Sequence, residues 1–189
     1  MPEKSIQLKI TLKGMRPPIW RRFVVPASIR LDKLHDVVQM VMGWDSSHLY
    51  AFDIFGEQYS DGDLDDAELA HKYSLKKFNP YKGMKFSYIY DFGDDWEHEI
   101  VVEDTDYQPD VKKLARLGIT PSKIMCIAGK RACPIEDIGG IWGYEGFLEA
   151  LKDPSSRKYD YYMKIFDFDP DYDSESFDLH SVNECINML

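Results

Sequence analysis

The chain has 189 residues, with 23 lysines and arginines against 33 aspartates and glutamates, a formal net charge of −10 at pH 7. Hydrophobic residues make up 44% of the sequence and aromatic residues 14%, which excludes an intrinsically disordered chain. The acidic balance argues against a general affinity for nucleic acid or anionic membranes, because both interactions need positive charge to displace counterions.

The sequence shows no signal for export or membrane insertion. No apolar run follows the charged start, and no stretch approaches the roughly 20 apolar residues of a membrane helix. The three cysteines, Cys126, Cys133 and Cys185, are an odd and sparse set that a cytoplasmic protein can keep reduced. We therefore expect a cytoplasmic protein that does not bind membranes.

The first half of the chain alternates between strand and helix patterns. Apolar residues alternate over residues 6–12 and predict a strand with one buried face. A second strand is predicted over 20–25, after two prolines that cannot donate to a ladder. Apolar residues then recur at helical spacing over 31–42, where Gly43 ends the helix, and 48–55 reads as extended chain.

The second half adds a hairpin and several short helices. Residues 84–90 and 97–103 predict two paired strands. The other expected segments are short helices at 111–117, 147–151 and 179–189, a glycine-rich loop at 129–143 and an acidic loop at 167–178. Hairpins interspersed with helices predict a single α+β domain over residues 1–189, with a mostly antiparallel sheet packed against several helices.

Two acidic runs have the 1-3-5 spacing of an EF-hand calcium loop. They are Asp61, Asp63 and Asp65, and Asp169, Asp171 and Asp173. Both lack the glycine at position six and the acidic residue at position twelve, so neither can close around a calcium ion. Solvated loops are the better interpretation of both runs.

Titratable residues concentrate around the turn of the predicted hairpin. They are Asp91, Asp94, Asp95, Glu97 and His98. Carboxylates crowded on a turn repel one another unless a cation lies nearby, and such crowding is typical of functional sites. Arg21 and Arg22, on an earlier strand, are candidate partners. A plain acidic hairpin tip in solvent is the structural alternative.

A metal site is a weaker prediction. Cys126 and Cys133 are not spaced like the close ligand pairs of zinc sites. A metal bound by Cys126, Cys133 or His98 would need further ligands brought together by the fold, such as His48, Glu136 or Asp137. Two buried thiols that pack as small hydrophobes are the simpler interpretation, and no cofactor is assigned.

Several segments occur in an order that resembles one known family. They are Pro17-Pro18-Ile19-Trp20-Arg21-Arg22, Leu34-His35, Met42-Gly43-Trp44, His48-Leu49, Tyr90-Asp91-Phe92-Gly93-Asp94-Asp95-Trp96-Glu97-His98, Gly129-Lys130-Arg131-Ala132-Cys133-Pro134, Glu136-Asp137, Gly139-Gly140, Gly143-Tyr144, Phe168-Asp169-Pro170 and Phe177-Asp178.

The chain resembles, over nearly its whole length, the family named for the third open reading frame of an Ri plasmid (pRiA4b), also labelled TnpR-like passenger proteins of insertion elements. The resemblance implies an α+β domain without a settled activity. Ile138 stands where many members carry a further cysteine, which weakens a multi-cysteine metal site. The resolvase-like label is not supported, because Ser5 lacks the arginine setting of a recombinase nucleophile and the charge does not suit DNA.

Two hypotheses follow. The leading one is a binding or accessory module with a polar pocket between the hairpin at 91–98 and the loop at 126–140. Its lining residues would be Arg21, Arg22, Asp91, Asp94, Asp95, Trp96 and His98 on one side, and Cys133, Glu136 and Asp137 on the other. A basic protein is the partner that the charge favours. The alternative is a metal-dependent hydrolase that uses the cluster of Asp91, Asp94, Asp95 and His98.

Overall fold

A computed structural model describes residues 3–62, 64–166 and 172–189. In these residues eight strands form one sheet in the order β5-β4-β3-β6-β7-β1-β2-β8, antiparallel except for the β4–β5 pair. The strands are β1 (Ser5–Leu12), β2 (Trp20–Pro26), β3 (Tyr50–Ile54), β4 (Glu57–Ser60), β5 (Glu68–Leu69), β6 (Lys85–Tyr90), β7 (Trp96–Asp104) and β8 (Met125–Lys130).

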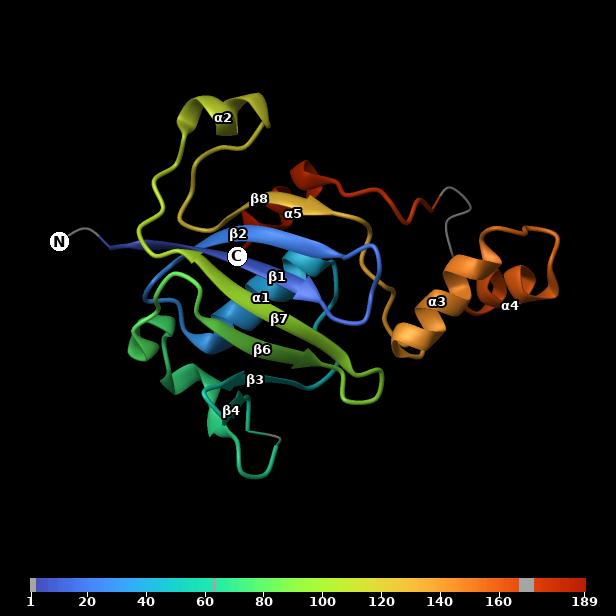
Figure 1. Cartoon of the computed structure of the whole chain (residues 1–189), viewed down its shortest axis with the longest axis horizontal. Helices are drawn as coiled ribbons and strands as arrows, with labels where there is room; N and C mark the ends of the chain where they lie inside the picture. Colours follow the sequence, from blue (N-terminus) through green and yellow to red (C-terminus); the bar gives the residue numbers. More distant parts are fainter. Residues whose placement is uncertain (1–2, 63, 167–171) are drawn as a thin grey trace.

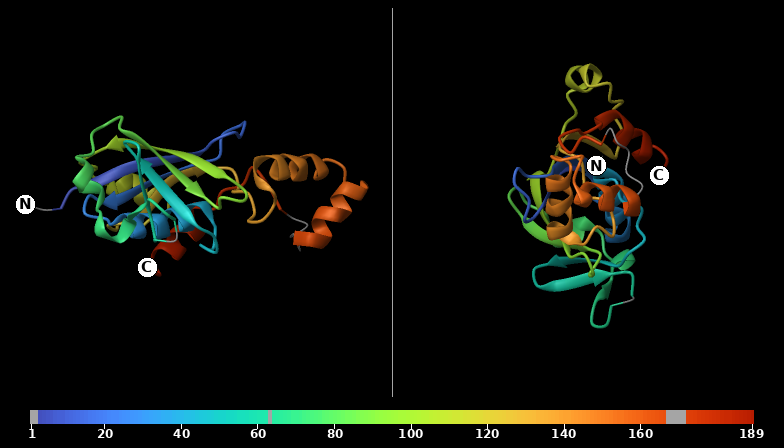
Figure 2. Two further views of the ribbon diagram at one scale, coloured as in Figure 1. Left: turned by 90° about the horizontal axis from the view of Figure 1, so that it is seen from below. Right: turned by 90° about the vertical axis from the view of Figure 1, so that its right-hand side faces the viewer.

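The helices divide into those near the sheet and a pair that projects from it. They are α1 (Leu31–Met42), α2 (Val111–Arg116), α3 (Gly140–Ala150), α4 (Arg157–Phe166) and α5 (Leu179–Ile186), with short 3-10 turns at Ala70–Lys72 and Leu75–Phe78. Figure 1 and Figure 2 show α1 against the sheet, and α3 and α4 beyond one end of it. None of the helices in the described ranges has the length and apolarity needed to cross a bilayer. The predicted α+β class with a mostly antiparallel sheet is confirmed.

The central strand β1 anchors the core. Its apolar residues Ile6, Leu8, Ile10 and Leu12 are at most 1% exposed. Leu8 lies opposite Phe23 of β2, and Ile10 lies opposite Ile100 of β7. Because side chains alternate along a strand, one face of the central sheet is apolar and packs in the same core cluster as α1.

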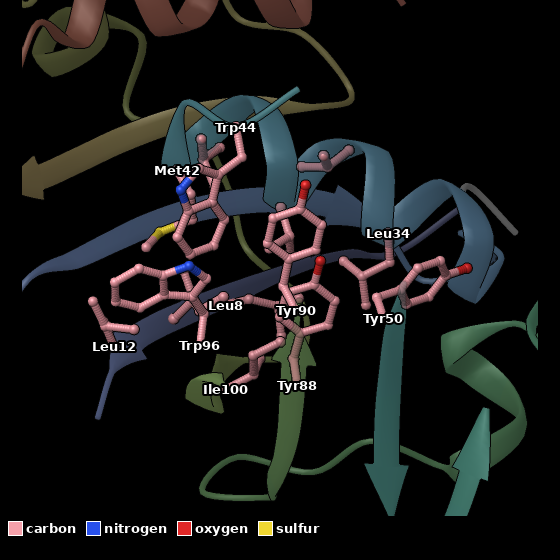
Figure 3. Packing of buried hydrophobic residues seen from close by; sticks show 14 of the residues in the cluster. Leu8, Leu12, Leu34, Met42, Trp44, Tyr50, Tyr88, Tyr90, Trp96 and Ile100 are labelled. Atoms are coloured by element: carbon pink, nitrogen blue, oxygen red, sulfur yellow. The ribbon is translucent and has the colours of Figure 1, made fainter. Parts of the chain in front are cut away.

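Helix α1 covers this face with an apolar stripe that carries two polar residues. His35 Nδ1 lies 2.8 Å from the Tyr88 hydroxyl, and Gln39 Nε2 donates to the same hydroxyl at 2.8 Å. The His35 ring also stacks on Tyr50, with centroids 3.7 Å apart. Figure 3 shows Tyr50, Tyr88 and Tyr90 in one aromatic layer with Trp44. This layer positions Tyr90, the last residue of β6, beneath the end of α1.

The chain leaves α1 through Gly43, whose φ of 94° is a left-handed conformation suited to glycine. Trp44 follows and stacks on Tyr90, with ring centroids 5.0 Å apart. Its indole Nε1 donates to the Pro134 carbonyl at 2.9 Å. The end of α1 is therefore bound both to the sheet and to the loop that leads into α3.

Several segments differ from the prediction. The strand β8 and the helix α4 were not predicted, and α3 begins at Gly140, inside the expected glycine-rich loop. The closing helix is shorter than expected and ends at Ile186. Parts of the two acidic runs, Asp63 and residues 169–171, lie outside the described residues, as does the Phe168-Asp169-Pro170 motif.

Substitution of Gly140, the first residue of α3, tests how closely this helix approaches the turn between β6 and β7. Gly140 has a φ of 66°, and a Cβ there would lie 2.4 Å from the Asp94 carbonyl oxygen, whereas Gly43 has a φ of 94° and open space. We expect Gly43→Ala to cost about 1–2 kcal/mol through its backbone conformation alone. Gly140→Ala should cost about 1–3 kcal/mol more, because it adds a steric clash. Urea unfolding of both variants measures the difference. Equal decreases in the free energy of unfolding would contradict the close contact between Gly140 and the Asp94 carbonyl oxygen.

Candidate functional site

Three loops meet at the end of the sheet from which α3 projects. They are residues 43–49 after α1, the turn 91–95 between β6 and β7, and residues 131–139 before α3; we call their meeting point the loop junction. Asp94 Oδ2 accepts a hydrogen bond from the Gly139 amide at 3.1 Å. The Asp91 amide donates to the Leu49 carbonyl at 2.9 Å. The hairpin turn is thus bonded to both of the other loops.

Glu136 is the hub of a hydrogen-bond network at the loop junction. Its Oε1 accepts from the Tyr90 hydroxyl at 2.7 Å and from the Asp45 amide at 3.1 Å. Its Oε2 accepts from the Ser47 hydroxyl at 3.0 Å. The Tyr90 hydroxyl in turn accepts from the His48 amide at 3.3 Å. Burial, reinforced by the bond to Glu136, raises the pKa of Tyr90, so this hydroxyl remains a donor at neutral pH.

The network holds the residues that come just before three potential metal ligands. Ser47 precedes His48, Tyr90 precedes Asp91, and Glu136 precedes Asp137. Among the described residues, His48, Asp91 and Asp137 form the one group of three histidine, cysteine or acidic residues whose ligand atoms all lie within 4.8 Å of one another. The bonds of Glu136 therefore fix the backbone on which these three side chains are mounted.

His48 Nε2 faces both carboxylates. It lies 3.3 Å from Asp137 Oδ1 and 3.8 Å from Asp91 Oδ2. The atom is buried and has no hydrogen-bond partner among the described residues. A buried polar atom without a partner is uncommon in a native structure and calls for an explanation.

Burial changes steeply across this group. The side chain of Asp91 is 10% exposed, that of His48 is 27% exposed, and that of Asp137 is 73% exposed. Asp91 and Asp137 both have left-handed backbone conformations, with φ of 54° and 59°, which aspartate tolerates better than most residues. The group is closed on the side of the sheet and open to solvent on the side of α3.

Two cavities flank the loop that carries His48. One, of about 410 Å³, is lined by Met42, Gly43, Trp44, Asp45, Cys133, Pro134, Ile135 and Glu136. The other, of about 330 Å³, is lined by His35, Asp36, Ser46, Ser47, His48, Leu49, Tyr50, Ser60 and Asp61. Neither lining contains a lysine or an arginine, so both present acceptor groups and carboxylates to a ligand.

The structure brings together some of the predicted site residues and separates others. Asp91, Asp94, Glu136 and Asp137 meet at the loop junction, which is the meeting of hairpin and loop that the binding hypothesis requires. Asp95 lies exposed in the same turn, with a φ of 57°. Residues 91–95 and 134–139 therefore lie side by side, although other residues predicted to line the pocket lie elsewhere.

Trp96 and His98 lie in the core instead of the site, because alternate residues of β7 point inward. Both are fully buried, and His98 packs edge-on against Trp44 with centroids 5.3 Å apart. Burial lowers the pKa of His98 to about 3. The cluster of Asp91, Asp94, Asp95 and His98 expected for a hydrolase is not assembled, since the aspartates occupy the turn and His98 faces α1.

Neither arginine balances the charge of the turn. Arg21 is buried, where its Nε donates to the Val41 carbonyl at the end of α1 at 2.7 Å, and its Nη1 donates to the Lys130 carbonyl at 3.0 Å. Arg22 points to the other face of the sheet, where its Nη2 donates to Glu103 at 2.9 Å. Successive residues of β2 face opposite ways, so the two cannot act together.

The cysteines do not form a metal site in the described part of the chain. Burial raises the pKa of the Cys126 thiol to about 11 and that of Cys133 to about 12, so both remain protonated at neutral pH. Each lies near the Arg21 charge, and Cys126 Sγ is 3.5 Å from the Arg22 carbonyl oxygen. The structure favours the interpretation of these thiols as small packing residues.

Comparison with known proteins identifies the family. The family model described as plasmid pRiA4b ORF-3-like protein matches residues 4–181. The chain belongs to this family. A curated member described as uncharacterized protein y4hQ, from Sinorhizobium fredii (strain NBRC 101917 / NGR234), is 38% identical over 197 aligned positions that cover 100% of this chain and 94% of that protein.

The fold of the pRiA4b ORF-3-like family is also represented among solved structures. The crystal structure of the protein of unknown function MM3350 from Methanosarcina mazei Go1 matches with a TM-score of 0.72 and 33% identity. The match covers 95% of this chain and 97% of that one. The descriptions of both relatives assign no activity, so the function must be argued from the loop junction itself.

The buried histidines predict a pH dependence of stability. Burial lowers the pKa of His98 to about 3 and that of His35 to about 4, whereas both have ordinary values near 6.5 when unfolded. The unfolded chain therefore binds more protons below pH 6.5, and stability present above that pH is lost on acidification. Each histidine contributes up to about 1.4 kcal/mol per pH unit.

Replacing His98 measures how much this residue contributes to the change of the free energy of unfolding with pH. We expect His98→Phe to make the free energy of unfolding less dependent on pH between 6.5 and 4.5, by up to about 1.4 kcal/mol per pH unit. Urea unfolding at several pH values measures it, with His71→Gln as the control because His71 is exposed. Parallel pH profiles for wild type and His98→Phe would contradict the burial of an uncharged His98.

Proposed function

We propose that this member of the pRiA4b ORF-3-like family is a cation-binding module whose site is the loop junction. The observation that carries the proposal is the buried, unpartnered His48 Nε2, which faces carboxylates from two other loops. A cation at this position would contact the nitrogen and both carboxylates at once.

The charge of the loop junction supports this function. Its carboxylates are Asp45, Asp91, Asp94, Asp95, Glu136 and Asp137. Within the described residues, no lysine or arginine forms an ion pair with any of them. Carboxylates held this close repel one another, and a bound cation would remove that cost.

The cavities beside residues 43–49 add further carboxylates to the neighbourhood of the loop junction. The cavity of about 410 Å³ contains Asp45 and Glu136 among mostly apolar residues, and the cavity of about 330 Å³ contains Asp36, Asp61, several hydroxyls and the neutral His35, whose pKa is lowered to about 4 by burial. We also propose a cytoplasmic location for this function, supported by three cysteines that are all free thiols.

The proposal predicts stabilisation by cations. A ligand at 100 times its dissociation constant adds about 2.7 kcal/mol to the free energy of unfolding. For a chain of this size we expect Tm to rise by roughly 5–10 °C with at least one of Mg²⁺, Mn²⁺, Zn²⁺ or spermidine at constant ionic strength. Differential scanning calorimetry of the full chain measures the shift.

A charge-matched pair of variants separates a site from a general electrostatic effect. Asp91→Asn with Asp137→Asn should abolish the shift, while Asp65→Asn with Asp66→Asn, in an exposed loop elsewhere, should retain it. Equal responses of the two double variants, or no shift with any of the four cations, would rule out cation binding at the loop junction.

A further inference from the structure

We infer that the cation is a divalent transition-metal ion bound directly by His48 Nε2, Asp91 Oδ2 and Asp137 Oδ1. This inference rests on the proposed cation-binding function and narrows its ligand to one chemical class. It names three ligands from three loops, at positions 48, 91 and 137, so the site exists only in the folded chain.

The spacing of the three donors fits such an ion. Nitrogen and oxygen ligands lie about 2.0–2.2 Å from zinc, so two ligands at the tetrahedral angle are about 3.3–3.6 Å apart. His48 Nε2 is 3.3 Å from Asp137 Oδ1 and 3.8 Å from Asp91 Oδ2. Small side-chain rotations would therefore bring all three atoms to coordination distance.

The imidazole nitrogen decides the class of metal. Magnesium and calcium select shells of oxygen ligands, whereas imidazole suits zinc, iron, nickel and copper. A shell of one imidazole and two carboxylates without a thiolate favours Zn²⁺, Mn²⁺, Fe²⁺ or Co²⁺ over ions that prefer sulfur. Two carboxylates and a neutral histidine also balance the double charge of the ion.

Asp91 is oriented by a hydrogen bond to its second oxygen, as ligands in established metal sites often are. Asp91 Oδ1 accepts a hydrogen bond from the Gly93 amide at 2.9 Å, which leaves Oδ2 for the metal. The Tyr90–Glu136 bond fixes the chain next to Asp91 and next to Asp137. Tyr90, Glu136 and Ser47 are thus positioning residues, not ligands.

Three protein ligands leave at least one coordination position to solvent. Asp137 lies on the exposed side of the group, so this position faces outward beside the start of α3. Zinc sites with three protein ligands and one open position can bind water or a further ligand there, unlike closed structural sites with four.

Cobalt substitution tests the inference on the full chain. We expect wild-type protein to bind one Co²⁺ with ligand-field absorption, and Zn²⁺ to displace it. His48→Gln should weaken Co²⁺ binding by at least about tenfold, while leaving any Mg²⁺ affinity within about threefold because magnesium does not need the imidazole. His71→Gln, an exposed histidine outside the loop junction, is the matched control and should bind Co²⁺ like wild type.

A second measurement does not depend on a variant folding. In ¹⁵N-labelled wild-type protein, adding diamagnetic Zn²⁺ should shift the Nε2 resonance of His48 and leave the ring nitrogens of His71 and His180 unchanged. These two results together would support the inference.

Each contrary result has a distinct meaning. If Mg²⁺ or spermidine stabilises the chain but Co²⁺ binding is the same in His48→Gln and wild type, the transition-metal inference is wrong and the cation-binding function stands. If Zn²⁺ moves no His48 resonance, direct ligation by His48 is wrong. If no cation binds at all, both proposals fail.

Discussion

The hydrogen bond between the Tyr90 hydroxyl and Glu136 connects the rigid part of this structure to the part that carries its chemistry. Tyr90 is fully buried, is the last residue of β6, and is held by the stacked Trp44. Glu136 belongs to the loop that leads into α3, which has no strand or helix of its own to position it. Through this bond the aromatic layer under α1 determines where the loop junction forms.

Neighbouring residues at the loop junction have different roles: one of each pair forms hydrogen bonds within the chain, and the next offers a potential metal ligand. Ser47, Tyr90 and Glu136 bond to one another, and the residues after them, His48, Asp91 and Asp137, face a common point. One hydrogen-bond network thus holds the loop junction together, while the three residues that follow its members bring their ligand atoms within 4.8 Å of one another.

The periodic spacing of apolar residues predicted those strands and helices that bury one face and expose the other. The strand β1 and the helix α1 each carry a complete apolar pattern, because each has one face in the core and one in solvent. The strand β8 lies at the edge of the sheet, and its sequence of Met-Cys-Ile-Ala-Gly-Lys has neither alternation nor β-branched residues beyond Ile127. Asn183 of α5 bonds both backbone groups of Cys126 along that edge, a contact that no local pattern can reveal.

The same reasoning explains which site residues could be predicted. Crowded carboxylates marked the turn 91–95 and the pair of Glu136 and Asp137, because charge density is visible in a sequence. Closeness to the aspartates led to the prediction that His98 lines the pocket, whereas His98 shares the inward face of β7 with Ile100 and Val102 and lies in the core. His48 could be named from the sequence only as one of several possible further ligands, since a loop residue is brought to a site by contacts distant in sequence.

Electrostatics then accounts for the geometry of the group as a whole. Asp91 is nearly buried and Asp137 is exposed, so the repulsion between them is screened on one side only. Their left-handed backbones cost on the order of 1–3 kcal/mol each, a cost that proteins accept mainly where a side chain must be aimed. A doubly charged ion among them would cancel both charges and leave a neutral centre, which is the form in which a half-buried site is least costly to desolvate. In the proposed metal site, a bound divalent cation would therefore stabilise this arrangement of the three loops.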